Sequence, residues 1–216
     1  LYVVGDTCSD DFPVTSGAYD TTFNSGYDVF VAKVSADGSQ LLWATFLGGS
    51  RYDYSAAIAV DDSGVYVTGR TSSTDFPVTN GAFGTAFNGG HNDVFVTKMR
   101  LDGTALLWST YLGGGQPTVP VTSDYPFDLA IDKAGNVYVA GSTDSTEFPT
   151  TPQAYDSNLD GTQDAFVAKL KADGSALDYA TYIGGTSHEY AHGLALDGSD
   201  QAYITGRTYS TDFPTT

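Results

Sequence analysis

The stretch VYVTGRTSSTDFP, residues 65–77, decides the fold because it occurs four times along the chain. Its copies are LYVVGDTCSDDFP at 1–13, VYVAGSTDSTEFP at 137–149 and AYITGRTYSTDFP at 202–214. The tyrosines of successive copies lie 64, 72 and 65 residues apart. Recurrence at this spacing indicates a fold assembled from similar supersecondary units that pack one on the next.

Three further short apolar runs recur within each unit. In the first unit they are DVFVAK at residues 28–33, LLWATFL at 41–47 and IAV at 58–60. An Asp-Gly pair, Asp37-Gly38, lies between the first two runs, and its equivalents recur downstream. Asp-Gly between strand patterns predicts a β-hairpin, for which we expect a type I′ turn. Each unit therefore contains four strand patterns, and helical periodicity of useful length is absent.

The sequence predicts an all-β fold of propeller-type blades, each a sheet of four antiparallel strands. The repeats of 64–72 residues form a single repeat domain over residues 1–216. Its units are approximately 1–64, 65–136 and 137–201, with a partial fourth unit at 202–216. Because three blades are fewer than a closed ring needs, we expect the chain to be part of a larger ring or assembly.

These motifs resemble the bacterial beta-propeller repeat family, also called the seven-bladed beta-propeller repeat. The resemblance rests on Gly-Gly, Tyr-Val-x-Gly-x-Thr, Asp-Phe-Pro and Asp-x-Phe-Val-x-Lys, and it covers essentially the whole chain. The departures are Leu177-Asp178-Tyr179 in place of Leu-Leu-Trp, and Glu147 where the other copies have Asp. The resemblance implies a secreted or surface-exposed bacterial protein with a binding or scaffolding role, and it carries no catalytic residues that could be transferred.

The composition excludes several classes of protein. The 216 residues include 26 acids and 9 Lys+Arg, for a formal net charge of -17, so we expect no binding to nucleic-acid phosphates. No apolar run of about 18 residues exists, which excludes a membrane-spanning helix. The single Cys excludes an internal disulfide framework. Of the acids, 24 are Asp, which favours turns, so the negative charge is expected in the loops.

Repeated acids are candidates for calcium ligands, because Ca²⁺ prefers carboxylate and carbonyl oxygens held by turns. The candidates are Asp28, Asp93 and Asp164 at the start of the buried runs, and Asp53, Asp124 and Glu189 after the Gly-Gly pairs. A third ring consists of Asp61, Asp132 and Asp197. None of them spells an EF-hand loop, and calcium is the one cofactor that the sequence suggests. The favoured alternative is structural: these acids cap turns or form a ladder of salt bridges with the repeated lysines, Lys33, Lys98 and Lys169.

The segment HEYAH, residues 188–192, fits the His-Glu-x-x-His pattern of zinc proteases. That pattern needs a helix to place both histidines on one face, and the surrounding sequence predicts a strand instead. Glu189 also aligns with Asp53 and Asp124 of the other units, whereas the histidines are not repeated. We therefore predict no catalytic residues and no enzyme.

The 12 Phe and 15 Tyr residues are expected to fill the interfaces between blades. Trp43 and Trp108 occupy equivalent positions, which supports this core role. The alternative is an aromatic face that stacks on sugar rings. One unit also carries a six-residue insertion within 115–123, and a loop on a rigid scaffold is a candidate contact site. A tolerated surface insertion is the equal alternative for that loop.

We expect a non-enzymatic extracellular or cell-surface protein that acts as a surface scaffold, filament or adhesion module. Its expected partners are other copies of itself, cell-surface proteins or polysaccharide. The alternatives are a lectin-like polysaccharide-binding propeller and, less favoured, a carbohydrate-active enzyme domain. Abundant Gly, Asp, Thr and Tyr with few Lys and Glu agree with secretion.

Overall fold

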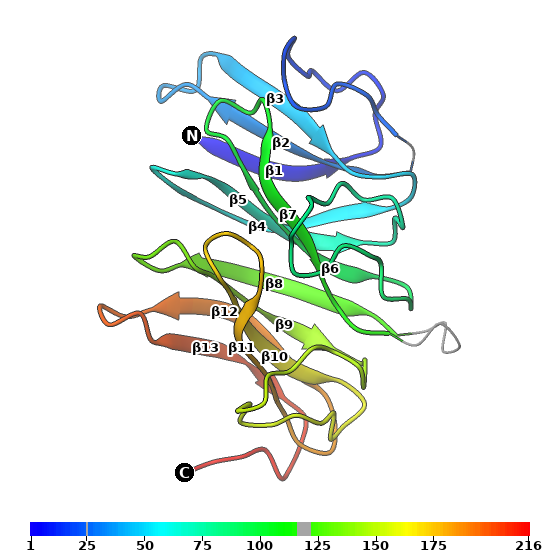
Figure 1. The fold of residues 1–216 in the computed structure, drawn as a ribbon, viewed down its shortest axis with the longest axis vertical. Coiled ribbons are helices and arrows are strands. Elements are labelled where there is room, and N and C mark those ends of the chain that lie inside the picture. Colours follow the sequence, from blue (N-terminus) through cyan, green and yellow to red (C-terminus); the bar gives the residue numbers. More distant parts are fainter. Residues whose placement is uncertain (25, 116–121) are drawn as a thin grey trace.

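The computed structural model describes residues 1–24, 26–115 and 122–216. These residues form thirteen β-strands and no helix, so among them no helix is long and apolar enough to cross a membrane. The strands make four antiparallel sheets stacked along the long axis of the molecule (Figure 1). The predicted all-β class is therefore confirmed.

The second and third sheets are the predicted blades of four antiparallel strands in chain order. The first sheet contains β1 (Tyr2–Thr7), β2 (Asp28–Val34) and β3 (Leu41–Leu47). The second contains β4 (Asp53–Asp61), β5 (Gly64–Thr71), β6 (Asp93–Met99) and β7 (Leu106–Leu112). The third contains β8 (Asp124–Ile131), β9 (Val137–Thr143), β10 (Asp164–Leu170) and β11 (Leu177–Ile183). The fourth contains β12 (Glu189–Leu196) and β13 (Ala202–Thr208).

The sheets are out of phase with the sequence units. The unit boundary at residue 65 falls at the start of β5, and the boundary at residue 137 falls at the start of β9. Each four-stranded sheet therefore takes its first strand from one unit and its other three strands from the next. As a result, the Gly-Gly segments that precede β4, β8 and β12 each cross from one sheet to the following sheet.

The interior of each blade is apolar on both faces of its third strand, as a continuous apolar run predicts. In β6, Val94, Phe95 and Val96 are fully buried. Phe95 lies over Gly69 of β5, where a Cβ would be only 2.6 Å from the ring. Phe76 of the Asp-Phe-Pro motif stacks on Phe95 with 4.5 Å between centroids. This arrangement of two phenylalanines and a glycine recurs with Phe30 and with Phe166.

The two tryptophans connect successive sheets. The indole Nε1 of Trp108 donates a hydrogen bond to the carbonyl oxygen of Ala172, 2.9 Å away in the hairpin of the next sheet. Gly174 of that hairpin has φ +69°, and a Cβ there would lie 2.5 Å from the Trp108 ring. Trp43 makes the equivalent bond to Leu101, at 3.1 Å. Both indoles are buried, so the predicted core role of the tryptophans is confirmed.

The Asp-Gly hairpins are present, but the predicted type I′ turn is wrong. That turn needs positive φ at both residues. Gly38 has φ +73°, whereas Asp200 is the one described non-glycine residue with positive φ. The loop instead closes with the Ser35 N–H donating to the Gln40 carbonyl at 2.9 Å. Asp37 Oδ1 accepts bonds from nearby serine hydroxyls, which stabilises an ordinary backbone conformation at this aspartate.

Candidate functional sites

The six acids of the calcium prediction come together as three pairs, one at each junction between consecutive sheets. The pairs are Asp28 with Asp53, Asp93 with Asp124, and Asp164 with Glu189. All six side chains are buried. The first member begins β2, β6 or β10, and the second begins β4, β8 or β12 of the following sheet. We call these the carboxylate pairs.

In the first two pairs, a glycine of the crossing segment lies against both carboxylates. A Cβ on Gly113 would be 2.7 Å from Asp93 Oδ1 and 2.7 Å from Asp124 Oδ2. Gly48 stands in the same relation to the first pair, at 2.7 Å and 2.9 Å. Any larger residue at this position would occupy the space into which the two carboxylates point, which explains the repeated Gly-Gly.

Both members of each carboxylate pair accept a hydrogen bond from a backbone N–H group. In the second pair, the Asn88 N–H donates to Asp93 Oδ2 at 2.6 Å, and the Gly114 N–H donates to Asp124 Oδ2 at 2.9 Å. The other oxygen, Asp93 Oδ1, is buried without a hydrogen-bond partner, as are one oxygen of Asp28 and one of Asp53. An unpartnered buried carboxylate oxygen is costly, so each of these pairs needs a proton or a cation.

Burial raises the pKa values of these acids. The pKa of Asp93 rises to about 7, and those of Asp28 and Asp164 rise to about 6. Burial also raises the pKa of Asp124 well above its ordinary value, and the charge of Asp93 adds to this effect. Burial acts on Glu189 too, but hydrogen bonds from Ser210, Thr208 and the Gly185 N–H outweigh it, so its pKa is lowered. A proton in the third pair therefore belongs to Asp164.

The geometry offers calcium only a partial ligand set. Ca²⁺ takes about six to eight oxygen ligands, and each pair supplies two carboxylates. No group of three or more His, Cys, Asp or Glu suited to a metal occurs among the described residues. The third ring, Asp61, Asp132 and Asp197, caps turns by accepting N–H bonds two residues ahead. Calcium at the carboxylate pairs stays a prediction, with a shared proton as its alternative.

The predicted ladder of salt bridges is wrong for two of the three lysines. Lys169 reaches Asp132 at 3.1 Å. Lys33 and Lys98 have no carboxylate oxygen within 4.0 Å in the described ranges. All three ammonium groups, including that of Lys169, lie 4.8–4.9 Å from the ring centroid of a repeated tyrosine, such as Tyr66 for Lys98. The tyrosine face attracts the cation, an interaction that charge counting from the sequence did not consider.

In the His-Glu-x-x-His segment, His188 lies just before the strand β12 and the other four residues lie on it, and the side chains have separate contacts. Glu189 is buried and belongs to its carboxylate pair. His188 contacts the Thr162 hydroxyl at 3.0 Å, and the His192 ring stacks on Tyr190 with 5.9 Å between centroids. Within the described chain, these residues form no metal-binding group.

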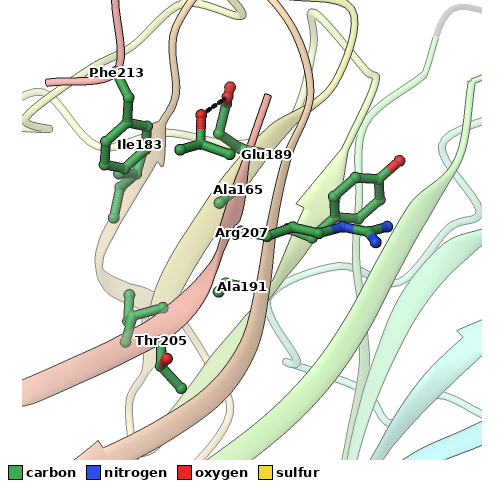
Figure 2. A pocket seen from close by; sticks show the side chains of 11 residues that line it. Ala165, Ile183, Glu189, Ala191, Thr205, Arg207 and Phe213 are labelled. Carbon is green, nitrogen blue, oxygen red and sulfur yellow. Dashed lines mark hydrogen bonds between the residues drawn. The ribbon is translucent and has the colours of Figure 1, made fainter. Parts of the chain in front are cut away.

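A second candidate site is the open edge of β13, which pairs with β12 alone among the described strands. A cavity of about 370 Å³ lies against it, and its walls include Ala165, Ile183 and Phe213 (Figure 2). Figure 2 shows the Arg207 side chain extending away from Ile183 and Phe213. These three side chains give the cavity an apolar wall beside β13, and Glu189 and Arg207 also line it.

In the complete sheets, this place is taken by a phenylalanine ring. Gly206 aligns with Gly69, which Phe95 covers. The three nearest atoms to a Cβ on Gly206 are backbone atoms of β12, and none of them belongs to a ring. Phe213 aligns with Phe76 and lines the cavity. The position over Gly206, beside Phe213, could therefore accommodate one more phenylalanine ring.

Tyr203 of β13 is the second residue of this edge that is less covered than its counterparts in the four-stranded sheets. Its counterparts Tyr66 and Tyr138 are buried beneath the repeated lysines, whereas Tyr203 is 59% exposed. A strand that carries Phe and, three residues later, Lys would cover both Gly206 and Tyr203. This is the spacing of the repeated Asp-x-Phe-Val-x-Lys run.

A third candidate site consists of two groups of tyrosine and arginine where β4 and β12 begin. In the first, the Arg70 guanidinium lies 4.7 Å from the Tyr54 ring centroid and 5.1 Å from that of Tyr125. Tyr52 stacks on Tyr54 at 6.4 Å with an interplanar angle of 9°. The sequence analysis favoured a core role for such rings and gave an aromatic sugar-binding face as the alternative, but it did not identify these residues.

In the second group, the Arg207 guanidinium lies 4.5 Å from the Tyr190 ring centroid and 5.2 Å from that of Tyr209. Arg207 follows the motif glycine Gly206, as Arg70 follows its own glycine. Two arginines at one repeated position of an acidic chain were the signal that could have revealed the site. The predicted contact loop at 115–123 lies largely outside the described residues, which omit 116–121.

Comparison with known sequences agrees with this architecture. The family described as Beta-propeller repeat matches residues 42–77, 107–149 and 178–214, which together make up more than half of the chain. No curated protein matches the sequence. Each matched stretch runs from the last strand of one sheet through the first two strands of the next, so it contains a whole junction. The chain therefore belongs to the beta-propeller repeat family, as its motifs indicated.

Proposed function

We propose that this repeat domain is a non-enzymatic, extracellular scaffold that assembles with further copies of itself. The observation that carries the proposal is the open edge of β13, with its cavity and the uncovered Gly206 and Tyr203. An exposed strand edge is a template for strand addition, and side-chain seats beside it give specificity.

A second copy of the chain carries a strand that could cover Gly206 and Tyr203. Its β2 presents Phe30 and, three residues later, Lys33. In its own sheet, β2 pairs with β1, whose sequence aligns with that of β13. If β2 of one copy left β1 and paired with β13 of a neighbouring copy, the four strands would follow the order β12-β13-β2-β3. This is the strand order of a four-stranded blade.

Sedimentation of the purified chain over a range of concentrations tests the assembly. We expect dimers or longer oligomers that a peptide with the sequence Asp164–Leu170 dissociates. The same peptide with Phe166 replaced by Ala is the matched control, because it keeps the backbone and charge but lacks the ring. A monomer at every concentration that does not bind the first peptide would exclude this mode of assembly.

The extracellular location is supported by the Asp-, Thr- and Tyr-rich composition with only 2 Glu. Protease treatment of intact cells that produce the protein tests this part separately. Loss of the protein from intact cells, with a cytoplasmic marker preserved, is the expected result. Protection until the cells are lysed would contradict it.

A further inference from the structure

Arg207 is one of only 9 Lys+Arg in a chain of 26 acids. Among the described residues, it forms no ion pair within 4.0 Å. Its guanidinium is held against the rings of Tyr190 and Tyr209, at 4.5 Å and 5.2 Å. The rings fix the plane of the guanidinium, while no described acceptor occupies its N–H groups. An ordered arginine with unused donors is suited to an anionic ligand.

The surface around Arg207 is hollowed. A depression of about 330 Å³ is lined by Ser187, His188, Tyr190, Arg207 and Tyr209. This volume is at the lower end of ligand clefts, which measure about 300–1,000 Å³. None of the lining side chains is a carboxylate, and Tyr209 is 61% exposed. The depression thus offers ring faces, hydroxyls, an imidazole and one guanidinium.

We infer that this depression binds a carboxylated sugar unit of an acidic polysaccharide. The guanidinium can take a carboxylate with two parallel hydrogen bonds, and the exposed ring of Tyr209 can pack on the apolar face of a sugar ring. The net charge of -17 repels a polyanion, but salt screens that repulsion beyond about 8 Å at physiological ionic strength. Contacts inside the depression are therefore decided by the local groups.

A linear polysaccharide presents its sugar units repeatedly, and the Tyr–Arg pair also recurs. Arg70 lies over Tyr54 two sheets away, in the position that Arg207 has over Tyr190. The intervening sheet has Ser142 at that position. The first group therefore provides a second contact along the stack for the same polymer. This binding function goes beyond the scaffold and does not depend on assembly.

Calorimetric titration with an oligogalacturonide and with its methyl ester tests the inference, because esterification removes the negative charge of the carboxylates and leaves the sugar rings unchanged. We expect saturable binding of the acid form and a loss of at least about tenfold in affinity for the methyl ester and for Arg207→Gln. Arg100→Gln is the matched control, since Arg100 is exposed and already paired with Asp102 at 2.8 Å. Tyr209→Ala should also weaken binding, whereas Tyr155→Ala, at a residue 71% exposed elsewhere, should not.

Circular dichroism and sedimentation of each variant separate loss of the sugar site from loss of folding or assembly. Equal losses for the Arg207 and Arg100 variants, or equal affinity for the methyl ester, would overturn the inference. Full competition by inorganic phosphate would also overturn it, because the site would then recognise any anion. Absence of binding by a folded wild-type chain would have the same consequence.

Discussion

The carboxylate pair at the junction of the second and third sheets should make the protein less stable as the pH rises. Asp93 is fully buried, and its pKa is raised by burial to about 7 from an ordinary value of 3.8. Below pH 3.8 both the folded and unfolded states hold this proton. Between 3.8 and 7 only the folded state holds it, so the free energy of unfolding falls with pH. Above about pH 7 neither state holds the proton, so the free energy of unfolding falls no further because of Asp93.

Asp93→Asn removes this dependence, because an amide has the shape of the protonated acid and does not ionise. A difference of about three pKa units corresponds to about 4 kcal/mol, at about 1.4 kcal/mol per unit. We therefore expect the variant to be more stable than the wild type by up to about 4 kcal/mol at pH 8 and equal to it near pH 4. The new amide can also donate to the Asp124 carboxylate, whereas the ionised Asp93 repels it.

Urea unfolding followed by tryptophan fluorescence at pH 4, 6 and 8 measures these free energies. Asp62→Asn is the matched control, since it removes one negative charge from an exposed turn. That control should change stability by well under 1 kcal/mol at every pH. A variant Asp93→Asn that is less stable than the wild type at pH 8, or that differs from it equally at pH 4 and 8, would refute the reasoning.

Three further predictions concern the same junctions. Gly113→Ala places a Cβ 2.7 Å from both carboxylates and should lower the free energy of unfolding by about 1–3 kcal/mol, measured by urea unfolding. Trp108→Phe leaves the Ala172 carbonyl without its donor and should cost at least about 1 kcal/mol, whereas Tyr179→Phe at the equivalent position should cost less; equal losses would contradict this. If calcium occupies the pairs, EDTA should lower the melting temperature of the wild type at pH 8 more than that of Asp93→Asn; no change with EDTA would exclude structural calcium.

The repeated motifs were sufficient to predict the strands and the four-stranded sheets. Val94 and Phe95 belong to a continuous apolar run, and such a run has few alternatives to a strand buried on both faces. The tryptophans could be placed in the core because Trp43 and Trp108 recur at one position. These features depend on local pattern, which a single sequence contains.

The pairing of the acids could not be predicted, because it depends on the phase of the sheets. Asp93 and Asp124 lie 31 residues apart and begin strands of different sheets. From the sequence alone, every repeated Asp was an equal candidate to face any other. The partner of Lys98 was missed for a different reason: the ring of Tyr66 competes with a carboxylate for a cation, and the register that brings the two together appears only in the folded sheet.

The phase shift between units and sheets has a consequence for how such a protein grows. Each unit contributes strands to two sheets, so the backbone itself ties every sheet to the next. Duplication of one unit would add a sheet already joined on both sides, with its Gly-Gly crossing and both acids in place. Deletion of one unit would likewise leave a continuous stack, one sheet shorter. Each repeat thus carries the link between two sheets, and the number of sheets can change without a new interface between them.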